Sequence, residues 1–245
     1  MKPNLYIVGG QKCGTTALAS FLQQHPDICL VQGKEAHIFD SPAHLTSDDA
    51  ALVNAYKALL PHYQGEKYLC DATPIYCYLP GIIARLAAFS PQAKVIMLVR
   101  DPVDRAISQY QMEHGRGHEP RSLLGAFLAE PTRLKQASDK WALGSPWRIH
   151  SYLDRGRFSD QLAIIKQHFK PEQVLVLHND DLRHQHQATL ARVFNFLELA
   201  NHDVPPQEVF AGQKKNMGLL DRLAVVYARL KLRRSICLTE EYRTF

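Results

Sequence analysis

The segment 4–20, with the sequence NLYIVGGQKCGTTALAS, constrains the fold of this chain more than any other. Residues 5–8 are apolar and partly β-branched, which is typical of a strand buried inside a parallel sheet. Gly9 and Gly10 end this strand, and apolar residues recur at helical spacing from Thr15 onward. The loop 11–14 therefore leads into a helix N-terminus, where unpaired backbone N–H groups and the helix dipole favour an anion.

This loop nearly matches the pattern G-x-x-x-x-G-K-[ST] of phosphate-binding loops. Gly9 and Gly14 supply the two glycines, and Thr16 supplies the final hydroxyl. Thr15 stands in the lysine position, and the lysine has moved to Lys12. Two hydroxyls after the last glycine, with a cation inside the loop, suit a terminal 5′-phosphate better than a magnesium-bound β/γ-phosphate pair.

Residues 10–18, GQKCGTTAL, resemble the 5′-phosphosulfate loop of sulfotransferases, in particular the branch of heparan-sulfate sulfotransferases and their bacterial relatives. The resemblance implies that 3′-phosphoadenosine 5′-phosphosulfate (PAPS) is the sulfate donor. It also implies that Lys12 is the main cation near the leaving oxygen and has a catalytic role. The residues implied to bind the donor here are Gln11, Lys12, Cys13, Gly14, Thr15 and Thr16.

A second resemblance lies in segment 34–39, KEAHIF, because family members often carry K-E-x-H-x-F after the second strand. By that match Glu35 is the candidate general base, and His37 either positions the acceptor or is the base itself. Attack of an alcohol on sulfur requires removal of the alcohol proton, which a carboxylate or an imidazole can accept. The alternative interpretation is a solvated pair of Lys34 and Glu35 beside a strand-end histidine.

The segment 71–76, DATPIY, resembles the family pattern E-K-T-P-x-Y but departs from it at Ala72. The glycosaminoglycan enzymes carry a lysine at this position near the reacting centre. The departure argues against a heparan-type acceptor. For Asp71, a helix cap beside a proline turn is as good an interpretation as a catalytic role.

Residues 95–99 predict another buried strand, which ends with Arg100 at the sheet edge where open α/β folds bind ligands. Residues 100–110, RDPVDRAISQY, resemble the family pattern R-D-P-x-x-R-x-x-S-x-Y, which holds the 3′-phosphate of the nucleotide. The resemblance assigns this role to Arg100 and Ser108, and a guanidinium suits it because it donates to two phosphate oxygens at once. Arg105 is expected to be structural, paired with Asp101 or another carboxylate.

The remaining segments carry weaker signals. In the loop 212–218, Lys215 and Gly218 loosely fit a K-x-x-G pattern that covers the 3′-phosphate in the family. Residues 111–150 are expected to be loop-rich and to surround the acceptor entrance. A helix is expected from Trp147 through Tyr152 and on to Phe169, which resembles a helix of the family. Residues 219–245 predict a basic amphipathic helix that docks on the domain, with homo-oligomer formation or membrane-surface contact as alternatives.

Composition narrows the class of protein further. A chain of 245 residues suits one domain, with a core at about 4–200 followed by the covering loop and the final helix. Five cysteines without a C-x-x-C pair argue against a disulfide framework or a zinc site. The net charge of +5 suits anionic ligands and does not require nucleic acid as a partner. Without a long apolar run or a signal peptide, we expect no transmembrane segment and a cytoplasmic location.

The alternation of strands and helices predicts a three-layer α/β domain, resembling the P-loop fold, with a central parallel sheet. With the resemblance, it predicts a PAPS-dependent sulfotransferase acting on a hydroxyl or amine of a small molecule, lipid or glycan. This scheme requires no metal, because fixed cations and N–H groups can neutralise the leaving phosphate. Two alternatives stay open: a small-molecule P-loop kinase, which Thr15 disfavours, and a catalytically inactive nucleotide-binding module, which Ala72 favours.

Overall fold

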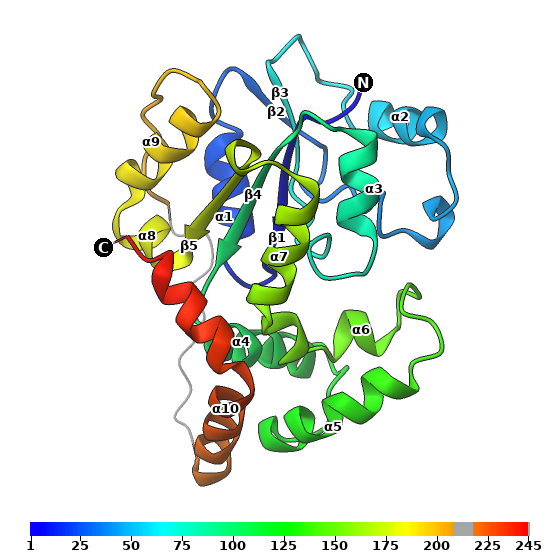
Figure 1. Ribbon diagram of the computed structural model, residues 1–245, viewed down its shortest axis with the longest axis vertical. Coiled ribbons are helices and arrows are strands. Elements are labelled where there is room, and N and C mark those ends of the chain that lie inside the picture. The colour runs from blue at the N-terminus through cyan, green and yellow to red at the C-terminus, as the bar shows by residue number, and fades with distance from the viewer. Residues whose placement is uncertain (208–217, 245) are drawn as a thin grey trace.

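A computed structural model describes residues 1–207 and 218–244 of the chain. Its centre is one sheet of five parallel strands in the order β2-β3-β1-β4-β5 (Figure 1). The predicted parallel α/β sheet is therefore confirmed. The strands are β1 (Leu5–Gly9), β2 (Ile28–Leu30), β3 (Tyr68–Asp71), β4 (Lys94–Val99) and β5 (Val174–His178).

Strand β1 and residues 95–99 of β4 are buried because helices cover both faces of the sheet. On one face α3 (Ile82–Phe89) and α7 (Phe158–His168) pack against each other. On the other face lie α1 (Thr15–Leu22) and α9 (His186–Phe196), whose Phe21 and His186 rings are 4.5 Å apart. This arrangement gives the three layers that the sequence predicts.

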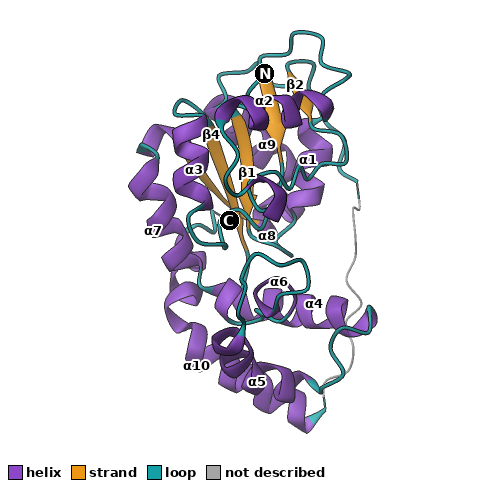
Figure 2. Cartoon of the chain, turned by 90° about the vertical axis from the view of Figure 1, so that its right-hand side faces the viewer, coloured by secondary structure: helices purple, strands orange, loops and turns teal. Residues whose placement is uncertain are grey.

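A smaller helical lobe lies beyond the carboxyl ends of the strands (Figure 2). It has its own apolar cluster, which includes Val103, Phe127, Tyr152 and Leu232. Its helices are α4 (Pro102–Gly115), α5 (Leu123–Gln136), α6 (Pro146–Ile149) and α10 (Leu219–Glu241).

Two expectations for this lobe were wrong. Residues 123–136 form a helix rather than loop, because Leu123, Ala126 and Phe127 recur at helical spacing and bury one face despite Pro131 within the helix. The helix expected from 147 to 169 is interrupted: its first part is only the single turn α6, a 3₁₀ turn (Asp154–Gly156) follows, and its second part is α7.

The remaining described elements are short and connect the layers. They are α2 (Asp49–Ala58), α8 (Asn179–His184) and 3₁₀ turns at Pro42–His44 and Pro171–Gln173. No helix within residues 1–207 and 218–244 is long and apolar enough to span a bilayer. Lys215 and most of the predicted covering loop lie outside the described residues.

The strand order fixes where a ligand can bind. After β1 the chain forms β2 and β3 on one side of this strand, and then β4 and β5 on its other side. The loops after β1 and β4 therefore diverge at the carboxyl edge, at the switch point where open parallel sheets form a crevice. In Figure 1 the strands β4 and β5 point from this sheet toward α4.

Candidate active site

The loop after β1 is held rigidly at the switch point. The Gly10 N–H donates to the carbonyl of Leu98 in β4 at 2.7 Å, and the Asn179 amide donates to the Cys13 carbonyl at 2.8 Å. Gly14 has φ +95°, and a Cβ on it would lie 2.5 Å from the Asn179 amide nitrogen. Only glycine fits there, and it places the N-terminus of α1 directly after the loop.

Four of the predicted donor-binding residues have distinct surroundings in this loop. Thr15 is buried, whereas Thr16 is exposed. Burial raises the pKa of the Cys13 thiol to about 12, so this side chain is neither ionised nor accessible at neutral pH. The side-chain oxygen of Gln11 accepts a hydrogen bond from buried Arg155. Cys13 and Gln11 therefore stabilise the loop through their contacts with the protein interior. Thr15 and Thr16 are the first two residues of α1, directly after the loop.

Two predicted donor-binding cations meet at this edge. An Arg100 Nη atom donates to the Lys12 carbonyl at 3.3 Å, although 88 positions separate the two residues. Burial, together with the positive charges of Arg116 and Arg100, lowers the pKa of the Lys12 amine. Mutual repulsion of this kind is relieved by a bound anion. Ser108 is partly buried on α4, two helical turns after Arg100.

A line of hydrogen-bonded charges extends from the loop after β2. One Glu35 carboxylate oxygen accepts from Lys34 Nζ at 2.6 Å, and the other lies 3.1 Å from His37 Nε2. The His37 Nδ1 atom is 3.0 Å from Oδ2 of buried Asp40. The structure thus places Glu35, His37 and Asp40 in one continuous row.

The charges in this row divide the roles of Glu35 and His37. Hydrogen bonds to Asp40 and Glu35 raise the pKa of His37 to about 10. Partial burial opposes ionisation of Glu35, but the hydrogen bonds from His37 and Lys34 outweigh it and lower the pKa of this carboxyl. At neutral pH the imidazole is a cation without a free lone pair, and the carboxylate is ionised. Glu35 is therefore the member of the pair that can accept a proton.

Lys34 contributes more than the sequence indicated. Besides its contact with Glu35, its Nζ donates to the Thr15 hydroxyl at 3.4 Å. The Lys34 backbone has φ +72°, and its carbonyl accepts from the Ala72 N–H at 3.1 Å. Lys34 thus brings an ammonium group to the end of the loop after β1, which we call the donor loop. Its backbone contacts Ala72, where the chain lacks the family lysine. In the sequence, Lys34 was visible only as the neighbour of Glu35 in the K-E pair.

Two arginines that the sequence did not single out join the base to the donor loop. Arg148 on α6 donates to Asp40 Oδ2 at 2.6 Å. The Arg148 carbonyl accepts from Arg155 at 3.0 Å, and Arg155 in turn donates to Gln11. Asp40 and Arg148 are 108 positions apart, so no local pattern could reveal their contact.

The expected partner of Arg105 was wrong. This buried guanidinium donates to Gln109 at 2.9 Å and to the Tyr152 carbonyl, and burial lowers its pKa to about 10. Asp101 instead caps α4 by accepting from the Val103 N–H at 2.8 Å. Arg105 is structural as expected, but it ties α4 to the segment before α7 rather than pairing with a carboxylate.

Asp71 stabilises the loop that bears Glu35 and His37, which we call the base loop. It is fully buried, and burial raises the pKa of its carboxyl. It accepts from the Thr73 hydroxyl at 2.6 Å, the Tyr56 hydroxyl at 2.8 Å and the Ala36 N–H at 3.3 Å. The last contact holds the chain between Glu35 and His37.

Among the described residues, Gly218 forms no hydrogen bond with the residues of this cluster. It precedes α10, and its N–H donates to Asp221 at 3.2 Å. The second member of that predicted pair, Lys215, is outside the described residues.

Known proteins of one family match most of this chain. The family model described as "Sulfotransferase domain" matches residues 2–210. The chain belongs to the sulfotransferase family. The resemblance inferred from its motifs is thereby confirmed, and the kinase alternative is not favoured.

Several curated relatives are heparan sulfate sulfotransferases. The mouse heparan sulfate glucosamine 3-O-sulfotransferase 3B1 is 31% identical over 197 residues, which are 80% of this chain and 46% of that protein. The human 3-O-sulfotransferase 3A1 is 32% identical over 80% of this chain and 44% of its own length. The chain spans about half the length of the curated relatives it matches.

Solved structures agree with the fold. A sulfotransferase from Alicyclobacillus acidocaldarius superposes with a TM-score of 0.75 at 27% identity, covering 97% of this chain and 96% of that one. The sulfotransferase domain from the curacin biosynthetic pathway has a TM-score of 0.55 at 15% identity, covers 99% of each chain and supports the fold alone.

Proposed function

We propose that this chain transfers a sulfuryl group from PAPS to an acceptor hydroxyl or amine, with Glu35 as general base. The observation that carries the proposal is the position of Lys34 Nζ, within 3.4 Å of the Thr15 hydroxyl and 2.6 Å of the Glu35 carboxylate. One side chain thus spans the donor loop and the base. A base this close to the loop suits attack on a group bound there.

The donor would bind across the loops after β1 and β4. Lys12, Thr15 and Thr16 would hold the 5′-phosphosulfate, and Arg100 and Ser108 would hold the 3′-phosphate. Two observations support this fit: Arg100 contacts the Lys12 backbone, and the positive charges of Arg116 and Arg100 help to lower the pKa of Lys12. A site with several positive charges favours a polyanion. The helix N-terminus at Thr15 adds N–H donors to the same site.

In the proposed step the acceptor oxygen or nitrogen attacks sulfur, and its proton passes to Glu35. The bond between sulfur and the bridging phosphate oxygen breaks, and 3′,5′-diphosphoadenosine leaves. Lys12 would stabilise the charge that develops on the leaving oxygen. His37, as a cation at neutral pH, would orient the Glu35 carboxylate and stabilise its ionised form.

We propose a carbohydrate or a small metabolite as the acceptor. Relatives named for heparan sulfate glucosamine support a carbohydrate. Buried Ala72 stands where the resemblance places a lysine in the glycosaminoglycan enzymes, so the proposal does not extend to heparan sulfate itself.

The test combines binding with transfer. We expect calorimetric titration to show tight binding of 3′,5′-diphosphoadenosine and much weaker binding of ATP. We also expect transfer of ³⁵S from labelled PAPS to at least one member of a panel of sugars and hydroxylated metabolites. Preferential binding of ATP would overturn the donor assignment. Nucleotide binding without transfer to any acceptor would favour an inactive binding module.

A further inference from the structure

The last helix, α10, buries only one of its faces. Its inward residues pack against α4, α5 and α7. They recur at helical spacing, so they form one stripe along the helix. These residues are Ala224, Ala228, Leu232, Ser235 and Thr239.

The opposite face carries a second apolar stripe, which we call the outer stripe and define as Leu219, Leu223, Val226 and Leu230. Their spacing of four, three and four residues places them on one line pointing away from the buried stripe. Their exposed fractions are 76%, 50%, 57% and 71%, and Leu220 beside them is 58% exposed. A contiguous exposed apolar patch of this kind usually marks a site of interaction with another molecule or a membrane.

Cations flank the outer stripe on both sides. At 3.6 residues per turn, three arginines lie along one edge and a lysine and an arginine lie along the other. All five are exposed, and none forms an ion pair with another described residue. They are Arg222, Arg229, Arg233, Lys231 and Arg234.

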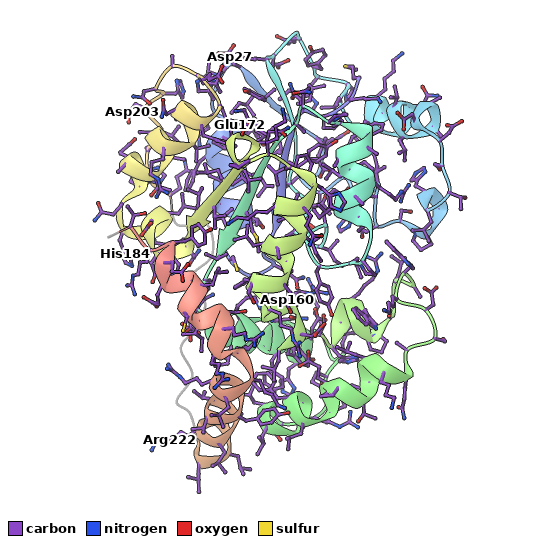
Figure 3. All side chains as sticks on the ribbon, in the orientation of Figure 1. Asp27, Asp160, Glu172, His184, Asp203 and Arg222 are labelled. Carbon is purple, nitrogen blue, oxygen red and sulfur yellow. The ribbon has the colours of Figure 1, made fainter. Side chains whose placement is uncertain are left out.

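Negative charge is almost absent from this part of the helix. Asp221 is the single acid between positions 219 and 239, and it accepts the N–H of Gly218 at the start of the helix. In Figure 3 Arg222 lies at the end of α10 remote from the sheet. The outer stripe is therefore flanked by positive charge along residues 219–239 of α10.

We propose that α10 docks on an anionic lipid surface, lying parallel to it. The leucines and Val226 would enter the boundary of the acyl chains, while the flanking cations would reach lipid phosphates. No described helix can cross a bilayer, so the contact is interfacial. This inference does not depend on the proposed sulfuryl transfer.

The charges decide against the other occupants. Two copies pairing through their outer stripes would set Arg222, Arg229 and Arg233 against arginines of the partner helix in either orientation, which is repulsive. A nucleic acid would satisfy the cations but leave the leucines in contact with phosphates and water. A membrane with anionic headgroups satisfies both parts of the face.

The test is co-sedimentation of the full chain with vesicles. We expect binding to vesicles that contain phosphatidylglycerol, and binding about ten-fold or more weaker to phosphatidylcholine alone. Raising the salt concentration should weaken the first and leave the second unchanged.

Two double variants separate the contributions of the two parts. Leu223→Gln with Leu230→Gln removes apolar area, and Arg233→Gln with Arg234→Gln removes charge; each should weaken vesicle binding about ten-fold or more. Leu143→Gln is the matched control, because Leu143 is 75% exposed but lies outside α10. Unchanged melting temperature and nucleotide affinity would show that the variants are folded.

Two results would overturn the proposal. One is wild-type protein that does not bind anionic vesicles, or double variants that bind them as well as wild type. The other is a dimer, detected by light scattering, that the leucine variant converts to monomer, since a second copy would then cover the outer stripe.

Discussion

His37 illustrates how its neighbours set the chemistry of a single residue. A histidine ordinarily titrates near neutral pH, but two carboxylates within hydrogen-bond distance raise the pKa of this one to about 10. The sequence left Glu35 and His37 as alternative bases. Their surroundings favour Glu35, because the imidazole already carries its proton at neutral pH.

Replacement of the base should separate turnover from binding. Glu35→Gln keeps the size of the side chain but cannot accept the acceptor proton, so we predict a fall in kcat of roughly 10²–10⁴-fold. The Kd of 3′,5′-diphosphoadenosine should change little. Glu172→Gln is the control, since Glu172 is exposed and remote from the loops. Equal losses of turnover and nucleotide affinity would remove Glu35 from the role of base.

Lys34 should control the pH at which the base becomes ionised. The ionised Glu35 carboxylate is present above its lowered pKa, so kcat should fall as the pH drops through that value. Lys34→Met removes a cation that lowers this pKa. We therefore predict a lower kcat and an acid limb of the pH–rate profile displaced to higher pH. A lower kcat with an unmoved acid limb would mean that Lys34 does not act on Glu35.

The site residues were predictable from sequence to the extent that each lies in a local motif. Arg100 directly follows buried strand β4 and Lys12 lies in the loop after buried strand β1, so their position at one sheet edge could be inferred from hydrophobic patterning. Arg148 could not, because its partner Asp40 is distant in sequence. Lys34 was visible but its direction was not, since the left-handed backbone that aims it is a property of the folded chain.

At the level of elements, the single turn α6 positions the base loop. Arg148→Met would leave the buried Asp40 carboxylate without its guanidinium, at a cost of about 3 kcal/mol in the free energy of unfolding. We expect urea denaturation to detect this loss, and kcat to fall with it because Asp40, the partner of His37, is no longer held in place by Arg148. Arg157→Met is the control, because Arg157 pairs with Asp154 in a partly exposed position. Equal destabilisation by both variants would contradict this role.

Helix α5 holds the segment before α7 through Glu130. This buried carboxyl accepts the N–H groups of Leu153 and Asp154 at 2.7 Å each, and burial raises its pKa to about 7. Because the unfolded chain ionises near pH 4.5, the unfolded state gains stability from that pH up to about 7 while the native state stays protonated. The contribution of Glu130 should therefore be largest below pH 4.5 and decline up to about pH 7.

Urea denaturation across this pH range tests the assignment. Glu130→Gln cannot ionise, so its free energy of unfolding should decline less than that of wild type between about pH 4.5 and 7. Parallel curves for the two proteins would show that Glu130 does not titrate in this range.

Helix α5 itself escaped prediction because Gly125 and Pro131 interrupt its pattern, and its burial against α10 outweighs their unfavourable propensities.

At the scale of the whole molecule, the strand order turns two distant loops into one site. Placing β1 beside β4 brings the loop after β1 and Arg100 into contact. Arg155 and Arg148 link the loop after β1 to the base loop. The parallel sheet and its loops followed from buried runs and turn residues in the sequence. The pairing of the loops with the helical lobe did not, because it depends on contacts between elements far apart in the chain.

The most direct measurement is a crystal structure of the chain soaked with 3′,5′-diphosphoadenosine. We predict the 5′-phosphate on the loop that bears Lys12 and Thr15, and the 3′-phosphate on Arg100 and Ser108, in one nucleotide. A nucleotide that contacts only one of these two loops would contradict the proposed donor site.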